Sequence, residues 1–82
     1  MSKVLVELYV PSIDKQYSFK IPNSIKIHEL IKILNKMIKE ESPEYYEDQK
    51  AVLCNQDTGV QFDINSFIGD SGIVNGSRMI LI

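Results

Sequence analysis

The chain has 82 residues, of which 44% are apolar and 24% charged, and this composition is typical of a single folded domain. The net charge of −2 disfavours nucleic acid as a partner, and no apolar run approaches the roughly 20 residues that span a bilayer. With one cysteine and no signal-peptide pattern at its N-terminus, we expect a cytoplasmic protein without disulfides.

The N-terminal part of the chain predicts an antiparallel β-hairpin. Over residues 4–10, apolar side chains alternate with others in the period-2 pattern of a strand that has one apolar face. Residues 11–15 carry turn-forming residue types, and residues 17–21 again alternate. The residues expected on the buried face of the first strand are Val4, Val6, Leu8 and Val10.

A change of period predicts an amphipathic helix over residues 25–41. Asn23 or Ser24 is expected to cap its start, and Pro43 to end it, because the residue before a proline resists helical angles. The apolar stripe consists of Ile27, Leu30, Ile31, Leu34, Met37 and Ile38.

The second half of the chain predicts short strands. We expect strands over residues 51–54 and 60–62, a turn or single helical loop over 65–70, and a last strand over 77–82. The helix can cover its stripe only against the apolar face of the sheet. The predicted fold is therefore one α+β domain, residues 1–82, in which one helix packs across a mixed sheet with the first and last strands adjacent at its centre.

The element order and the C-terminal sequence resemble the ubiquitin-like β-grasp fold. In that family the end of the chain reads, loosely, Leu-x-Asp-x-x-Ile-x-x-Gly-x-x-Leu-x-Leu-x. The matching positions here are Ile68, Asp70, Ile73, Gly76, Met79 and Leu81. Within the superfamily the chain is most similar to the YukD/EsaB group, on its size, the pattern Ile25-x-Ile27-x-Glu29-Leu30-Ile31 and Asn55 after the third strand.

This resemblance implies a small cytosolic accessory or regulatory component of a bacterial type VII (ESX/WXG100) secretion system. The alternative is a ubiquitin-like modifier or sulfur carrier. Those proteins end in a flexible Gly-Gly tail, because only glycine threads the narrow channel of an adenylating enzyme. This sequence ends with Met79-Ile80-Leu81-Ile82, so we expect no conjugation.

The chemistry-bearing residues do not form a catalytic or metal-binding pattern. His28 is the only histidine and is expected to be exposed or half-exposed on the helix, and Lys32, Lys36 and Lys39 are expected on a solvated helix face. Cys54 is expected to be a structural strand residue. We therefore predict no enzyme activity, no cofactor and no metal site. The acidic stretch 42–49 is interpreted either as a docking loop or as a solvated segment with one tyrosine against the core.

The outer face of the sheet is the predicted binding surface. If alternate residues of the first and last strands face the helix, the others form an apolar patch on the opposite face, and such patches usually have a partner. The pattern does not decide which residues of the third strand face the helix, so the phase of that strand stays open. The predicted partner-binding residues are Leu5, Tyr9, Val52, Cys54, Ile80 and Ile82. Docking of a protein partner is the first hypothesis, and self-association through the same patch is another.

Overall fold

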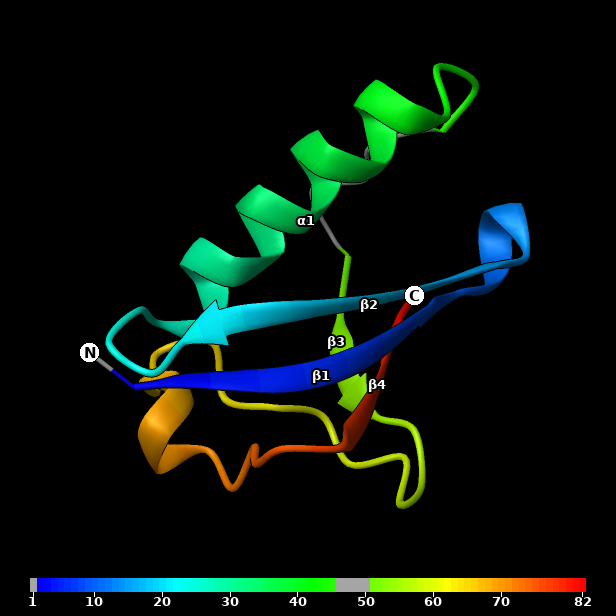
Figure 1. The fold of residues 1–82 in the computed structure, drawn as a ribbon. Helices are drawn as coiled ribbons and strands as arrows, with labels where there is room; N and C mark the ends of the chain where they lie inside the picture. The colour runs from blue at the N-terminus through cyan, green and yellow to red at the C-terminus, as the bar shows by residue number, and fades with distance from the viewer. Residues whose placement is uncertain (1, 46–50) are drawn as a thin grey trace.

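The computed structural model describes residues 2–45 and 51–82. The chain begins with strand β1 (Lys3–Val10), a single 3₁₀ turn (Pro11–Ile13) and strand β2 (Lys15–Pro22). Helix α1 (Ile27–Glu41) follows, and then the short strand β3 (Leu53–Asn55). A second 3₁₀ turn (Ile68–Asp70) precedes the last strand, β4 (Ser77–Leu81). These elements form two layers, a twisted sheet with one helix across it (Figure 1).

The sheet has the mixed topology that the sequence predicted. Its four strands lie in the order β2-β1-β4-β3. Strand β1 pairs antiparallel with β2 and parallel with β4, in a register that sets Leu8 opposite Met79. Strands β3 and β4 are antiparallel. The first and last strands are thus adjacent at the centre of the sheet, and the predicted α+β architecture, one helix across a mixed sheet, is confirmed.

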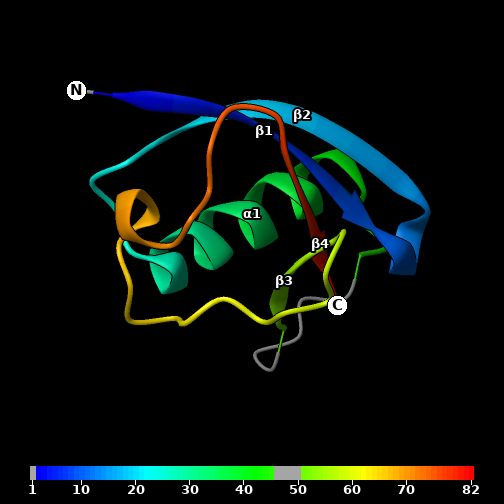
Figure 2. The ribbon, with the colours of Figure 1, turned by 90° about the horizontal axis from the view of Figure 1, so that it is seen from below.

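The core lies between the inner face of the sheet and the apolar stripe of α1. Alternation along the strands points every second side chain toward the helix, and the 3.6-residue period of α1 places its apolar stripe on the side that faces the sheet. Seen from below in Figure 2, the helix lies behind the sheet. Among the described residues, the apolar side chains with at most 1% exposure are Val6, Leu8, Val10, Ile27, Leu30, Leu34, Ile38, Leu53, Ile68 and Met79.

The start of α1 differs from the sequence prediction. The residue before the helix is Lys26, with extended backbone angles, and neither Asn23 nor Ser24 caps it. The first amide groups instead donate to carbonyls of a distant loop, Ile27 N–H to Ser66 O (2.9 Å) and His28 N–H to Ile64 O (3.1 Å). A tertiary contact therefore replaces the local side-chain cap, because the free N–H groups at a helix start can donate to any well-placed oxygen.

The predicted fourth strand, residues 60–62, is reduced to one bridge between Cys54 and Gln61. Two backbone hydrogen bonds hold this segment along β3, from Asn55 N–H to Val60 O (2.8 Å) and from Phe62 N–H to Leu53 O (3.0 Å). The segment covers the outer edge of β3 without continuing as a strand. The third strand starts two residues later than predicted, and its phase is now settled, since Leu53 points into the core and is 1% exposed.

Candidate outer-sheet binding site

The outer face of the sheet brings several predicted residues into neighbouring rows. Tyr9 on β1 lies opposite Ile80 on β4, which in turn lies opposite Cys54 on β3. Val52 and Ile82 extend this ladder by one row, because each amide donates to the other's carbonyl at 2.7 and 2.9 Å. Neighbouring strands are about 4.8 Å apart, so these side chains are direct neighbours.

The residues of these rows differ in how much of their surface is exposed to solvent. Ile82 is 63% exposed, and Tyr9, Val52 and Ile80 are half-buried. Cys54 is only 7% exposed, which is a correction to its predicted role in binding. The backbone of Cys54 pairs with Ile80 on one side and bridges to Gln61 on the other, so this small side chain lies between two neighbouring segments. We call the accessible group, Tyr9, Val52, Ile80 and Ile82, the sheet patch.

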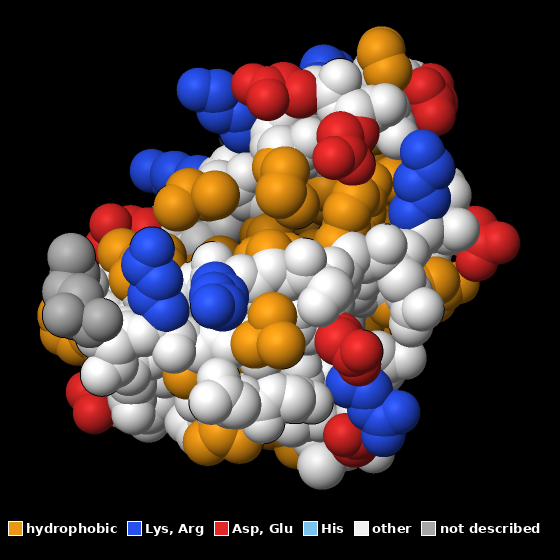
Figure 3. Space-filling view, viewed as in Figure 1, with side chains coloured by type: hydrophobic (Ala, Val, Ile, Leu, Met, Phe, Trp, Pro, Cys, Tyr) orange, Lys and Arg blue, Asp and Glu red, His pale blue; other side chains and the backbone are white. Residues whose placement is uncertain are grey.

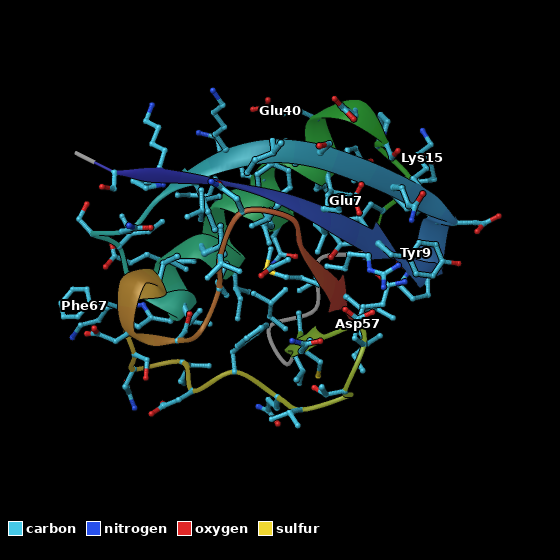
Figure 4. The ribbon with its side chains drawn as sticks, turned by 60° about the horizontal axis from the view of Figure 1, so that its bottom comes forward. Glu7, Tyr9, Lys15, Glu40, Asp57 and Phe67 are labelled. Carbon is cyan, nitrogen blue, oxygen red and sulfur yellow. The ribbon has the colours of Figure 1, made fainter. Side chains whose placement is uncertain are left out.

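Leu5 lies apart from the sheet patch although it is 45% exposed. Between Leu5 and Tyr9, β1 carries Glu7, which is paired in register with Arg78 on β4. This charged row crosses the sheet, and four residues along a strand separate Leu5 from Tyr9 by about 13 Å. The predicted outer residues therefore do not form one continuous apolar surface. Figure 4 shows Glu7 and Tyr9 along β1.

Two polar contacts border the sheet patch. The Arg78 guanidinium donates to Asp57 Oδ1 at 2.6 Å, and both side chains are about half exposed at 54%. Such an exposed ion pair orients side chains more than it stabilises the fold. The Tyr9 hydroxyl donates to Asp14 Oδ1 at 2.9 Å. This hydrogen bond, with smaller effects of burial and of the Asp14 charge, raises the pKa of Tyr9 above its usual value.

Other candidate residues lie away from the sheet patch. Lys32, Lys36 and Lys39 are exposed on the helix, and His28 is half-buried near its start. Tyr45 is buried and donates from its hydroxyl to Asn35 Oδ1 at 2.7 Å, as predicted for one tyrosine of the acidic stretch. Residues 46–49 of that stretch lie outside the described residues.

Several exposed apolar side chains were not predicted as binding residues. Besides Leu5 and Ile82, the large ones in the described part of the chain are Ile33, Val60, Ile64, Phe67 and Val74. Phe67 has the Lys26 ammonium over its ring, 5.4 Å from the ring centre. Most of these residues lie in loops, where no periodic pattern distinguishes an exposed side chain from a buried one. Ile33 carried a usable signal, because it lies off the apolar stripe of the helix.

The loops beyond β3 enclose an open hollow of about 410 Å³. It is lined by Asn55, Thr58, Val60, Gln61, Phe62, Asp63, Ser66, Asp70, Ser71 and Gly72. Within residues 2–45 and 51–82, no three histidine, cysteine or acidic side chains come together in a way that could hold a metal ion. The same residues contain no helix that is both long and apolar enough to cross a membrane.

Comparison with solved structures identifies the fold. No family model and no curated protein matches the chain. The ubiquitin-like domain of EccD5 from Mycobacterium xenopi is 19% identical and has a TM-score of 0.74 over 100% of this chain and 94% of that one. The ubiquitin-like domain of the type VII secretion protein EccD1 from Mycobacterium tuberculosis is 13% identical, with a TM-score of 0.75 over 100% and 99%.

A third match lies in a larger protein. In the ESX-5 inner membrane complex, the whole of this chain matches 21% of one chain, with a TM-score of 0.73 and 16% identity. These similarities define a ubiquitin-like β-grasp domain with structural neighbours among the EccD domains of type VII secretion. At such identities the similarity establishes the fold, and a fold supports many functions.

Proposed function

We propose that this chain is a non-enzymatic ubiquitin-like binding module that docks a protein component of a type VII secretion system in the cytoplasm. The observation that carries the proposal is the sheet patch. The folded chain leaves Ile82 63% exposed beside the half-buried Tyr9, Val52 and Ile80, on the sheet face opposite the helix. Contiguous apolar side chains at such a place favour association with another protein.

The secretion system is proposed from the comparisons. Two of the similar structures are ubiquitin-like domains of EccD proteins, and a third is part of an inner membrane complex. The YukD/EsaB group, which the sequence resembles, is associated with the same systems. A small accessory component that binds one of their proteins fits both relationships.

The test compares two charge substitutions on opposite sides of the molecule. Ile82→Glu puts a carboxylate on the sheet patch, whereas Ile33→Glu puts one on the helix, at a side chain of similar exposure (53% against 63%). The affinity-tagged chain is expressed in its own host, and co-purified secretion proteins are quantified by mass spectrometry. We expect Ile82→Glu to lower their recovery about tenfold or more, and Ile33→Glu to leave it unchanged.

Three results would count against this proposal. Equal recovery with both variants would mean that the sheet patch is not the binding site. Recovery of no secretion protein would contradict the assignment to a secretion system. A covalent, isopeptide-linked form of the chain in the same samples would favour the modifier alternative. Light scattering on the purified wild-type chain and on Ile80→Glu tests for self-association. If the wild type forms a dimer through the sheet patch, Ile80→Glu should be a monomer.

A further inference from the structure

The sequence contains one asparagine that is followed by glycine. Five asparagines occur, at positions 23, 35, 55, 65 and 75, and only the last precedes a glycine, Gly76. Such a pair is chemically labile, because glycine has no side chain to keep its amide nitrogen away from the asparagine side chain. The pair Asn75-Gly76 is thus the place in this chain where the backbone most readily attacks a side-chain amide.

The pair forms the middle of a tight turn that leads into β4. Ser77 N–H donates to Val74 O at 3.0 Å, and Gly76 has a φ of 87°. Among the described residues other than glycine, only Asp14 has a positive φ, so the φ of Asn75 is negative. These angles define a type II turn. Val74 N–H also donates to Ser77 Oγ at 2.9 Å, which closes the turn a second time.

Strand β1 holds both members of the pair. Leu5 N–H donates to Asn75 Oδ1, and Leu5 O accepts from Gly76 N–H, each at 2.8 Å. The neighbouring row of the parallel ladder pairs Val6 with Ser77. The side-chain amide of Asn75 therefore takes the place of a main-chain acceptor at the end of the β1–β4 ladder. Figure 2 shows this segment beside β1 just before β4 begins.

The hydrogen bond to Leu5 O opposes deamidation of Asn75. In that reaction the Gly76 nitrogen attacks Asn75 Cγ and gives its proton to solvent. The N–Cγ bond forms, the Cγ–Nδ2 bond breaks, and the side-chain nitrogen takes up a proton and leaves as ammonia. The Gly76 nitrogen of the resulting cyclic imide carries no hydrogen and cannot donate to Leu5 O. The ring therefore closes only after the turn has separated from β1.

Water completes the modification by opening the imide at either of its two carbonyls. Cleavage of the bond from the Gly76 nitrogen to Cγ gives aspartate. Cleavage of the bond from this nitrogen to the main-chain carbonyl carbon gives isoaspartate, in which the main chain runs through Cβ and Cγ. Asn75 and Gly76 are both exposed, so water reaches them. In the view of Figure 3, backbone and uncharged side chains form most of the lower surface, where the segment before β4 passes below β1.

The two products differ in the contacts with β1 that they can rebuild. Aspartate keeps a side-chain oxygen that accepts from Leu5 N–H. In isoaspartate the Cγ carbonyl and Gly76 N–H belong to one trans peptide unit, whose C=O and N–H point in opposite directions. Leu5 presents its own N–H and C=O to the same turn, so the isoaspartyl form loses at least one of the two hydrogen bonds.

We propose that Asn75-Gly76 is a site of spontaneous deamidation that strand β1 controls. While the turn is bonded to Leu5 the pair is protected, and each opening of the turn exposes it to ring closure. The modification advances with the time that the turn spends open, and isoaspartate then keeps the turn from bonding fully to β1. The proposal is independent of the sheet patch, because the turn precedes β4 whereas Ile82 lies beyond its end.

The test compares two rates in the whole chain at one pH and temperature. Deamidation of Asn75 is followed by peptide mapping with mass spectrometry, and opening of the turn by hydrogen exchange of the Gly76 amide. Both need the same opening, so folding should slow both by the same factor, about tenfold or more, relative to a free peptide of residues 71–80. Isoaspartate should exceed aspartate among the products. Asn65, exposed and followed by serine, should stay intact over the same period.

Two serine variants provide the matched comparison. Ser77→Ala removes the acceptor of Val74 N–H and leaves both hydrogen bonds to Leu5 in place. It should speed exchange of Gly76 and deamidation by the same factor, about threefold. Ser18→Ala, at an exposed position of β2, should change neither rate.

The products test the role of Leu5 directly. The variant Asn75→Asp should keep the Leu5 amide protected from exchange, whereas the purified isoaspartyl form should lose protection at Leu5 or Gly76. Protection of both amides in the isoaspartyl form would overturn this role. The control by β1 is overturned if the folded chain deamidates as fast as the peptide, or if Ser77→Ala speeds exchange without speeding deamidation. An intact Asn75 in a chain whose Gly76 amide exchanges freely would overturn the site itself.

Discussion

At the scale of single residues, the Tyr9–Asp14 hydrogen bond links the sheet patch to the hairpin turn. Asp14 has a positive φ of 50° and accepts from the Tyr9 hydroxyl at 2.9 Å. Because the neutral phenol is the donor, this bond and the Asp14 charge both oppose ionisation and raise the pKa of Tyr9. The resulting stabilisation is present below the ordinary pKa of 10.0 and is lost as pH rises through the higher pKa of the folded chain.

We predict that substitutions at Asp14 lower the pKa of Tyr9 in steps. Asp14→Asn keeps an acceptor and removes the charge, and Asp14→Gly removes both while suiting the positive φ. The pKa of Tyr9, measured from its ring ¹³Cζ NMR shift, should be highest in the wild type, lower in Asp14→Asn and near 10.0 in Asp14→Gly. An unchanged value in Asp14→Gly would mean that the hydrogen bond does not form in solution.

The sequence correctly separates most side chains of the two central strands into an inner and an outer set. Period 2 suffices for this, and so Val6 and Met79 are buried while Leu5 and Ile82 are exposed. The sequence pattern did not predict the burial of Cys54, because this burial depends on the segment around Gln61, seven residues later, which lies against β3. Nor does an apolar pattern reveal that Glu7 and Arg78 divide the outer face.

At the scale of elements, tertiary contacts determine where α1 begins. Lys26 has extended angles and no side-chain acceptor, yet Ser66 and Ile64 accept the first amides of the helix. The sequence predicts the body of the helix from its long amphipathic period. The start is set by hydrogen bonds to residues nearly 40 positions later, which local cap signals at Asn23 and Ser24 cannot report.

We predict that a better local cap at this position adds little. A serine at a helix start typically stabilises by about 1 kcal/mol relative to alanine, by accepting from a free amide. Since the amide of His28 is already bonded to Ile64, Lys26→Ser and Lys26→Ala should differ by less than about 0.5 kcal/mol in the free energy of unfolding. Urea unfolding followed by circular dichroism measures the difference. A gap of about 1 kcal/mol would contradict the tertiary cap.

At the scale of the whole molecule, the two ends of the chain meet in the centre of the sheet. The parallel register pairs Val6 with Ser77 and Leu8 with Met79, and α1 packs over both strands. No local segment of the chain therefore contains the core. The helix can bury its apolar stripe only against strands paired from distant segments, which favours one cooperative transition.

We predict that Met79→Ala destabilises every element together. Met79 is 0% exposed between β1 and α1, and removing such a side chain costs about 2–5 kcal/mol. A chain of this size has about 4–12 kcal/mol in total, so the urea midpoint should fall steeply. Ile80→Ala on the same strand, half-buried on the outer face, should cost less than about 1.5 kcal/mol. Helix and sheet signals should unfold at the same urea concentration in both variants, because separate transitions would mean that α1 persists without the central strand pair.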